Sequence, residues 1–265
     1  MTPRMINLRD QEVLLTGMAE AAQEAGIYLI GEQQGLGMEA VEVKGRNDFV
    51  SYVDRESERR IVRRLKALLP GAGFWAEEEA RMDGDGDARW IIDPLDGTTN
   101  YIHGLPLYAV SIALENRGQV VAGLVYEPVH AEMFTAALDI PSCLNGVPIR
   151  VSGHARMEEG LLATGFPYHD FSKLEAYLGL LDFALRNSRG VRRWGSAAVD
   201  LSYVACGRFD GFFEYGLKPW DVAAGALIVG QAGGWVCDFK GKADYLYGQE
   251  IIASNPVLGQ VLQHK

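Results

Sequence analysis

The sequence predicts an α+β or α/β protein in which helices pack against mixed and antiparallel sheets. Apolar residues recur at helical spacing near the N-terminus, short strand-like runs fill the middle of the chain, and helical and strand-like runs mix in the later part. The chain has 265 residues, of which 48% are hydrophobic and 23% charged. It is therefore long enough to bury one sizeable core or two closely joined ones.

The first expected element is a long amphipathic helix from about Val13, because apolar residues recur every three or four positions as far as Leu29. A short strand or hairpin follows over residues 41–51, and then a second helix with Ile61 on its apolar stripe. At 100° per residue, Asp54 lies about 20° from Ile61, so its carboxylate is expected to point inward. A favourable interaction with the helix dipole is the alternative explanation.

The middle of the chain is predicted to form an antiparallel meander, because four apolar or alternating runs are separated by Gly, Asn and Pro. These runs are "RWIID", "LYAVSIALE", "QVVAGLVYE" and "EMFTAA". In the later part we expect strands at 160–164 and in "GFFEY", helices at 173–186, 196–205 and 219–232, and a final strand and helix. No repeat, low-complexity tract or linker divides the chain, so a single unit over residues 1–265 is expected.

The charge pattern argues against a nucleic-acid partner. The formal net charge is −10 and the isoelectric point is near 5.0, whereas nucleic-acid binders usually present a basic stripe. Basic residues do gather between Arg55 and Lys66, but they alternate with Glu56 and Glu58. That alternation favours a solvated helix face with ion pairs.

The sequence also indicates a protein of the reducing cytoplasm. Its first residues lack the apolar stretch of a signal peptide, and no apolar run approaches the roughly 18 residues that span a membrane, so no membrane partner is expected. The cysteines Cys143, Cys206 and Cys237 are odd in number and form no C-x-x-C pair. Neither a disulfide framework nor a zinc site is therefore predicted.

Carboxylates stand at the ends of several predicted elements. "WIIDPLDGTTN" delivers Asp93 and Asp96 after an apolar triplet, and "FWAEEEA" places Glu77–Glu79 after another. The helix in "PWDVAAGALIVGQAGG" is apolar on nearly all sides, yet Asp221 opens it. Each position has a separate structural explanation, since Asp-Gly is a common turn and an acidic residue suits a helix start. With Asp54, however, four segments carry acidic groups that few basic neighbours neutralise.

If these groups converge, their repulsion requires a cation. Like charges about 4 Å apart cost on the order of 4 kcal/mol per pair at an effective dielectric of about 20. Oxygen ligands select Mg2+, Mn2+ or Ca2+ over zinc, and a carboxylate that bridges two ions is usual in two-metal phosphoryl-transfer sites. Gly97, Thr98 and Thr99 would add backbone N–H groups at a predicted helix start, where a phosphate is favoured.

Two long motifs resemble one protein family. "WIIDPLDGTTNYIHGLP" and "KPWDVAAGALIVGQAGG" are similar to D-P-x-D-G-T-x-N and W-D-x-A-A-G, the defining motifs of the inositol monophosphatase family. The resemblance extends along almost the whole chain, and "TGFPYHD" is closer to bacterial members than to animal ones. It implies a layered αβαβα sandwich, a Mg2+-dependent phosphomonoesterase, a homodimer and inhibition by Li+. The metal motif then lies in a half over residues 1–150, and a substrate-side half covers residues 151–265.

The resemblance implies a role for each matching residue. A first Mg2+ would be bound by Glu77, Asp93 and the Leu95 carbonyl, a second by Asp93, Asp96 and Asp221, and a third, weaker ion by Glu77 through water. Mn2+ could replace Mg2+. Thr98, supported by Asp54, would orient the attacking water, and the N–H groups of Gly97 and Thr98 would hold the phosphoryl oxygens. Substrate hydroxyls would lie against Asp96, Gly195, Ser196, Ala197, Glu214 and Asp221.

Two assignments stay open. Relatives commonly read G-E-E where this chain has Ala76 before three glutamates, so the metal ligand could be any of Glu77–Glu79. Glu77 is preferred because Phe74 aligns with the apolar residue three positions before the first glutamate. The sugar-contacting residue near Phe166 is also undecided.

The expected activity is hydrolysis of inositol monophosphate or a similar sugar phosphate. Glu214 favours a polyol, because a carboxylate accepts hydroxyl donors and repels a second phosphate. Fructose 1,6-bisphosphate, histidinol phosphate and adenosine 3',5'-bisphosphate are the alternative substrates. A metal-bound interaction protein without activity is the alternative of a different kind.

Overall fold

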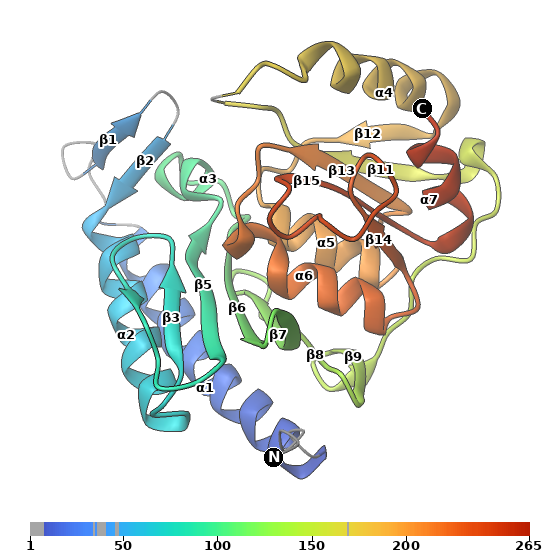
Figure 1. Ribbon diagram of the computed structural model, residues 1–265. Coiled ribbons are helices and arrows are strands. Elements are labelled where there is room, and N and C mark those ends of the chain that lie inside the picture. The colour runs from blue at the N-terminus through green and yellow to red at the C-terminus, as the bar shows by residue number, and fades with distance from the viewer. Residues whose placement is uncertain (1–7, 34, 36–40, 46–47, 169) are drawn as a thin grey trace.

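The computed structural model describes residues 8–33, 35, 41–45, 48–168 and 170–265 (Figure 1). Its helices are α1 (Leu8–Gln33), α2 (Tyr52–Leu68), α3 (Thr98–Ile102), the 3-10 helix η2 (Met157–Glu159), α4 (Leu174–Asn187), α5 (Ala197–Ala205), α6 (Pro219–Gln231) and α7 (Pro256–Gln263). Its strands are β1 (Val41–Gly45), β2 (Asp48–Ser51), β3 (Gly73–Ala76), β4 (Arg81–Met82), β5 (Ala88–Asp96), β6 (Ala109–Asn116), β7 (Gln119–Glu127), β8 (Glu132–Ala137), β9 (Ile140–Leu144), β10 (Val147–Pro148), β11 (Leu161–Thr164), β12 (Gly190–Arg192), β13 (Gly211–Tyr215), β14 (Trp235–Cys237) and β15 (Glu250–Ser254).

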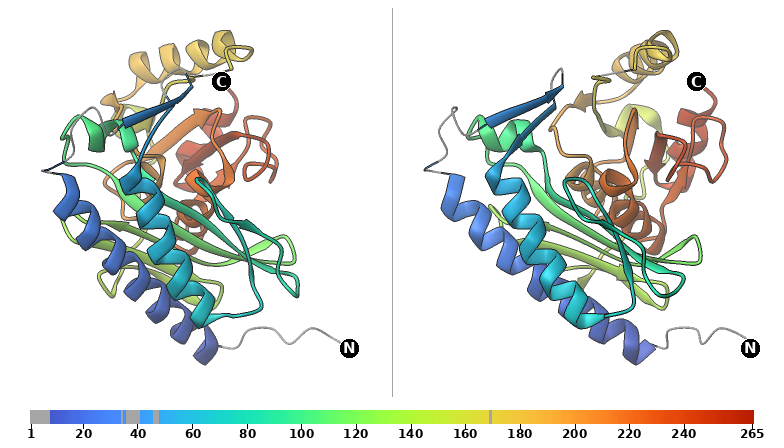
Figure 2. Two further views of the ribbon diagram at one scale, coloured as in Figure 1. Left: turned by 90° about the vertical axis from the view of Figure 1, so that its left-hand side faces the viewer. Right: turned by 60° about the vertical axis from the view of Figure 1, so that its left-hand side comes forward.

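Helices and sheets alternate in layers. α1 and α2 lie side by side across one face of an eight-stranded sheet (Figure 2), and α6 packs on its other face. α5 and α6 form the middle layer, which also contacts a five-stranded sheet. α4 and α7 pack on the outer face of that second sheet (Figure 1). The predicted αβαβα arrangement is confirmed.

α1 has the predicted amphipathic character, although it begins at Leu8, before the apolar periodicity becomes visible. One stripe of α1 is buried against α2 and the sheet, and it consists of Leu14, Met18, Ala21, Ala25 and Leu29. Between α1 and α2, where a short strand or hairpin was expected, the strands β1 and β2 pair antiparallel. The first two helices therefore cover the sheet as their sequence patterns require.

The eight-stranded sheet has the order β10-β9-β8-β7-β6-β5-β3-β4. Its strands from β5 to β9 pair antiparallel with their neighbours in sequence, so the predicted meander is confirmed. β3 instead runs parallel to β5. The segments that follow β3 and end β5 therefore leave the sheet at the same edge.

The five-stranded sheet has the order β12-β11-β13-β15-β14. β11 runs parallel to β12 and β13, whereas β15 runs antiparallel to β13 and β14. The predicted strands and helices of this part are all present, and the short β12 and β14 add to them. β12 and β14 have three residues each, too few to show a periodic pattern.

α6 packs unusually close to the eight-stranded sheet. A Cβ atom added to Gly123 of β7 would lie 3.0 Å from the carbonyl oxygen of Ala224 in α6. The absence of a side chain at Gly123 therefore lets the start of α6 approach the sheet.

Neither a membrane-spanning helix nor a disulfide was expected from the sequence. Among the helices in these ranges, none is long and apolar enough to cross a bilayer. Cys143, Cys206 and Cys237 are free thiols.

Candidate active site

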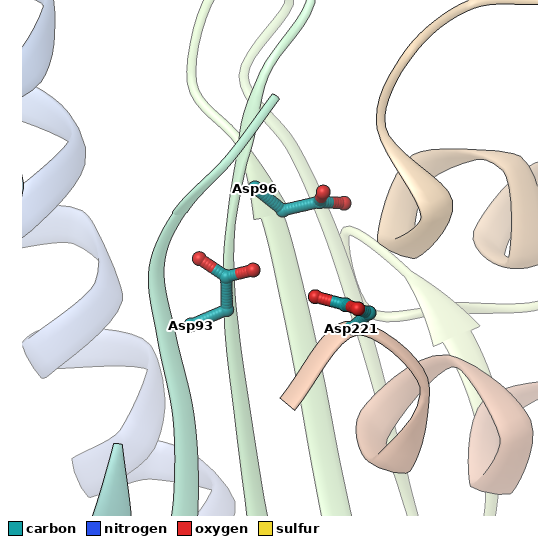
Figure 3. Close-up of side chains that lie close together, drawn as sticks. All are labelled: Asp93, Asp96 and Asp221. Carbon is teal, nitrogen blue, oxygen red and sulfur yellow. The ribbon is translucent and has the colours of Figure 1, made fainter. Parts of the chain in front are cut away.

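Three aspartates meet where β5 ends and α6 begins. Asp93 and Asp96 come from β5 and Asp221 from the first turn of α6, and each offers an oxygen within 4.8 Å of the others. Their side chains point toward one another in Figure 3. In the described part of the chain, this is the one group of three or more metal-ligating side chains that are this close.

A bulge in β5 explains why Asp93 and Asp96 point to the same side. Side chains three positions apart on a regular strand face opposite sides of a sheet. Here Asp93 pairs with Ser111 and Asp96 with Ala109, so β5 contains one more residue than β6 over this stretch. Pro94 lies inside the bulge, where a residue without an N–H costs no ladder hydrogen bond.

Burial and mutual repulsion both oppose ionisation of Asp93. Its side chain is 2% exposed. Burial raises the pKa of Asp93 well above its usual range, and the charges of Glu77, Asp96 and Asp221 raise it further. The main-chain N–H of Leu95 donates to Oδ1 of Asp93 at 2.9 Å and partly offsets these effects.

Asp221 caps its helix and also belongs to the acidic group. The main-chain N–H of Lys218 donates to Oδ2 of Asp221 at 2.6 Å, so the capping explanation for this residue holds. Burial, followed by the charge of Asp96, raises the pKa of Asp221 to about 7. The local role and the convergence are therefore compatible.

Asp96 joins the acidic group to the start of α5. Its Oδ2 accepts hydrogen bonds from Oγ of Ser196 at 2.6 Å and from the N–H of Ala198 at 2.7 Å. Burial raises the pKa of Asp96, and these hydrogen bonds and the charge of Arg193 oppose the rise. Ser196 is also the N-cap of α5, since its Oγ accepts from the N–H of Val199.

Of the three glutamates after β3, Glu77 is the one whose charge acts on Asp93. Its N–H donates to the carbonyl of Ile92 at 3.1 Å, and its charge raises the pKa of Asp93. Glu79 instead forms ion pairs with Arg55 and Arg59, at 3.7 and 3.3 Å. Glu77 therefore acts on the aspartates, whereas Glu79 is paired with arginines.

Glu58 holds the turn that carries Glu77. Its carboxylate accepts hydrogen bonds from the N–H groups of Glu78, Glu79 and Ala80 at 2.8, 2.9 and 2.6 Å. Glu58 is 2% exposed, so its expected place on a solvated helix face is wrong. Glu56 does form the expected ion pairs, with Arg59 at 3.9 Å and Arg60 at 3.0 Å. Glu58 follows Asp54 by four residues, and that spacing on the buried stripe is the signal that was missed.

Asp54 points inward, as its place on the helix stripe predicts. It is 1% exposed, and Oγ of Thr98 lies 3.2 Å from its Oδ1 and 2.9 Å from the carbonyl of Leu95. A hydroxyl has one hydrogen, so Thr98 donates to only one of these two acceptors at a time. If a cation takes the Leu95 carbonyl, the Thr98 hydrogen is left for Asp54 or for a water.

Gly97 turns the chain from β5 into α3. Its φ of 95° is in the left-handed region, which glycine adopts without strain. An added Cβ atom would also lie 3.2 Å from the carbonyl of Leu107 and 3.3 Å from that of Gly195. Gly97 therefore brings Thr98 close to the turn that precedes α5.

A cavity of about 320 Å3 opens beside the acidic group. Most of the predicted site residues line it, namely Glu77, Asp96, Gly97, Thr98, Gly195, Ser196, Ala197, Glu214 and Asp221. Asp54, Asp93 and Leu95 are not among the lining residues. A larger cavity of about 510 Å3, beside Trp75 and Tyr247, contains none of the predicted site residues. The predicted residues and the acidic group therefore mark the smaller cavity as the candidate site.

Glu214 enters this cavity from β13 against a glycine. It is 8% exposed, and a Cβ atom added to Gly165 would lie 2.1 Å from its carboxylate. Burial raises the pKa of Glu214 well above its usual range, and Asp221 adds to the rise. Gly165 is therefore the residue that leaves room for the Glu214 carboxylate.

Several residues that line the cavity were not among the predicted site residues, and Asp200 and Arg193 are two of the charged ones. The guanidinium of Arg193 lies 5.8 Å from the ring centre of Phe166 and 5.6 Å from that of Tyr168. Asp200 is buried in α5, and an aspartate inside the apolar run "AAVDLSYVA" was the available signal. Arg193 is two residues before the Gly195 turn, and no local pattern marks it.

The ligand atoms fit a hard cation. All candidate donors are carboxylate or carbonyl oxygens, and burial makes their charge costly without a counterion.

A family model described as the inositol monophosphatase family matches residues 10–265. The chain belongs to the inositol monophosphatase family.

Relatives within this family carry two kinds of name. The chain is 43% identical to the inositol-1-monophosphatase of Mesorhizobium japonicum over 95% of both chains. It is also 43% identical to the Nus factor SuhB of Pseudomonas aeruginosa over 89% of both chains. The crystal structure of the extragenic suppressor protein SuhB from Bartonella henselae superposes with a TM-score of 0.90, at 42% identity, over 95% of this chain and 97% of that one. The inositol monophosphatase fold and family are thus established, whereas the names differ.

Proposed function

We propose that this chain is a Mg2+-dependent phosphomonoesterase that converts inositol monophosphate and water into inositol and phosphate. The observation that carries the proposal is the convergence of Asp93, Asp96 and Asp221 beside a cavity that is also lined by Glu77 and Thr98. Hydrolysis of a phosphate ester needs a cation for the phosphoryl charge and an oriented water, and these residues are suited to both tasks.

The chain offers a set of oxygen ligands for two or three ions. Glu77, Asp93 and the Leu95 carbonyl would hold the first, and Asp93, Asp96 and Asp221 the second. Glu77 could reach a third through water, and Mn2+ could take the place of Mg2+. Bound there, Mg2+ would polarise the phosphoryl group and lower the pKa of a coordinated water.

The remaining residues bind and orient. Thr98, with Asp54 behind its hydroxyl at 3.2 Å, orients the attacking water, and Glu77 accepts a hydrogen bond from it. The N–H groups of Gly97 and Thr98 face the phosphoryl oxygens at the start of α3. The inositol hydroxyls lie against Glu214, Asp96, Asp221 and the turn formed by Gly195, Ser196 and Ala197. In this scheme residues 1–150 supply most metal ligands, and residues 151–265 supply most substrate contacts.

One observation supports a bisphosphate as the second candidate substrate. Arg193 lines the cavity and could attract a second phosphate, such as that of fructose 1,6-bisphosphate. Its charge, however, already acts on Asp96, Asp200 and Glu214, whose pKa values it lowers. The polyol monophosphate is therefore preferred. The relatives named Nus factor SuhB are the reason to keep a non-catalytic interaction role as the contrasting hypothesis.

The test is a phosphate-release screen with Mg2+ or with a chelator. Its substrates are inositol 1-phosphate, fructose 1,6-bisphosphate, histidinol phosphate and adenosine 3',5'-bisphosphate. We expect the highest kcat/KM for inositol 1-phosphate and no release with the chelator. A clearly higher kcat/KM for fructose 1,6-bisphosphate than for inositol 1-phosphate would refute inositol monophosphate as the substrate. Absent or Mg2+-independent release across the whole panel would refute the enzyme and favour the interaction protein.

The predicted homodimer, inhibition by Li+ and cytoplasmic location rest on the family resemblance and the sequence, and they stay predictions. The same is true of the expected absence of a nucleic-acid partner.

A further inference from the structure

Asp200 has a buried carboxylate, and one of its oxygens accepts no hydrogen bond from the described residues. It lies in α5, is 1% exposed and lines the cavity that also contains Glu214. None of the residues that the structure describes donates a hydrogen bond to its Oδ1. Buried polar atoms almost always have a partner, so this oxygen requires an explanation.

Three donors close to Asp200 in the chain are already in use. The hydroxyl of Ser196 and the N–H of Ala198 both donate to Asp96, and the hydroxyl of Ser202 donates to the carbonyl of Ala198. The acidic groups that act on Asp200 are Glu214 and Asp96, and the basic group that acts on it is Arg193. Glu214 and Asp96 repel an ionised Asp200, and neither of them forms a hydrogen bond with its Oδ1. The cavity that Asp200 lines is the route by which a partner for Oδ1 can enter.

A second metal centre is not the explanation for Asp200. The group of close metal-ligating oxygens in the described residues contains Asp93, Asp96 and Asp221, and it does not extend to Asp200 or Glu214. Arg193 also supplies positive charge at this end of the cavity. The missing partner is therefore a neutral hydrogen-bonding group. Water has this chemistry, and so does the hydroxyl of a bound polyol that would displace it.

We propose that Asp200, next to Glu214, binds a ring hydroxyl of the substrate and so determines specificity for polyol phosphates. The inference rests on the proposed function and names a further contact within its site. It does not depend on the protonation state of Asp200, because a hydroxyl can donate to a carboxylate and accept from a carboxylic acid. The cavity then selects a monophosphate whose carbon skeleton carries hydroxyls on the side away from the phosphorus.

The test compares two substrates with the same ring. Inositol 1-phosphate carries ring hydroxyls, whereas cyclohexyl phosphate has none. We expect Asp200→Ala to lower kcat/KM for inositol 1-phosphate about tenfold, mainly through KM, and to change that for cyclohexyl phosphate less than about twofold. Asp200→Asn keeps a donor and an acceptor, so it should retain most of the activity on inositol 1-phosphate. Asp200→Leu fills the same volume and is expected to show the selective loss if the alanine variant does not fold.

Asp238→Ala is the matched control. Asp238 is 5% exposed, lies outside the cavity lining and accepts hydrogen bonds from the N–H groups of Lys240 and Lys242. Its loss should lower the Tm and leave the ratio of the two kcat/KM values unchanged. Asp200→Asn should not lower the Tm of the metal-free protein, because Oδ1 of Asp200 has no partner to lose.

The outcomes separate this inference from the proposed function. Equal losses on both substrates, or no loss on either, would overturn the assignment of Asp200. A larger loss on a phosphorylated amino alcohol than on inositol 1-phosphate would also overturn it in favour of an ammonium donor. If the wild-type protein hydrolyses neither ring phosphate, the proposed function fails. The Asp200 contact is then decided by calorimetry with free inositol, and equal affinities of wild type and Asp200→Ala would refute it.

Discussion

Asp93 and Asp221 bring carboxylate oxygens within 4.8 Å of each other, although one belongs to a sheet and the other to the helix layer above it (Figure 3). Burial is the main reason why the pKa values of both residues are raised, and neighbouring carboxylates add to it. The ionised group therefore opposes folding unless a cation is bound.

Asp93→Asn is expected to abolish turnover and to leave the metal-free protein as stable as the wild type or slightly more stable. The substitution removes one repelling charge at a position that is 2% exposed. Calorimetric Tm values with a chelator and with Mg2+ test this, together with phosphate release. Asp182→Asn, at an exposed ion pair with Arg186, serves as the control and should change neither activity nor Tm appreciably. A sharply lowered Tm in the chelator would contradict the prediction.

Stability without metal should fall as the pH rises toward neutrality. The pKa of Asp221 is about 7 in the folded state, against 3.8 as its usual value, so between these values the folded protein binds more protons than the unfolded one. The contribution of this group is thus fully present below about pH 3.8 and lost as the pH rises through about 7. Mg2+ competes with these protons, so the increase in Tm that it causes should grow with pH.

Thermal unfolding at about pH 5.5 and about pH 8, each with and without Mg2+, measures both effects. Asp93→Asn under the same conditions should show a smaller dependence on Mg2+. An increase in Tm caused by Mg2+ that is the same at both pH values would argue against cation binding by the ionised aspartates.

Glu77→Gln should reduce kcat by more than about 100-fold and raise the Mg2+ concentration needed for half-maximal activity, because the proposed metal ligand is lost. Glu79→Gln is the matched control. The ion pairs of Glu79 with Arg55 and Arg59 are partly solvated, so activity should stay within about twofold. Magnesium titrations of phosphate release distinguish the two. A greater loss in the Glu79 variant would move the ligand to another glutamate.

Gly165→Ala should raise KM for inositol 1-phosphate roughly tenfold, because its Cβ atom would displace the Glu214 carboxylate from a distance of 2.1 Å. The increase in Tm with Mg2+ should not change, since Gly165 lies outside the acidic group. Gly179→Ala in α4 is the control, because its Cβ atom would contact nothing within 4 Å. It should raise stability by up to about 1 kcal/mol. An unchanged KM in Gly165→Ala would show that the position of Glu214 is not needed.

Glu58→Ala should lower both the free energy of unfolding and kcat. Three main-chain N–H groups of the turn after β3 lose their acceptor, and a cost of about 3 kcal/mol is expected. Glu58→Gln retains one acceptor oxygen and should be milder. Urea unfolding and steady-state kinetics test the pair. Equal stability of the alanine variant and the wild type would mean that water replaces the Glu58 carboxylate.

Much of the architecture could be predicted because hydrophobic periodicity is a property of neighbouring residues. The stripe from Leu14 to Leu29 and the alternating runs from Trp90 onward follow from where apolar side chains must be buried. Asp54 could also be predicted to point inward, since its angle on the helix depends on local spacing alone. The acidic residues at element ends were visible for the same reason.

The convergence of these residues could not be predicted from spacing. In a regular β5, the side chains of Asp93 and Asp96 would face opposite sides of the sheet. The bulge, which is defined by the pairing with β6, puts them on the same side. The buried acceptor Glu58 was hidden among charged residues because its partners are the N–H groups of a distant turn.

The order of helices and strands, the acidic character of their ends and the family motifs were therefore present in the linear chain, because they depend on residue type and on spacing of a few positions. The location of Asp221 beside β5, the different surroundings of Glu77 and Glu79 and the burial of Asp200 arise from contacts between distant segments. For Asp221, they include the close approach of α6 to β7 at Gly123. Local periodicity contains no information about such contacts, since it is the same whichever segment packs opposite.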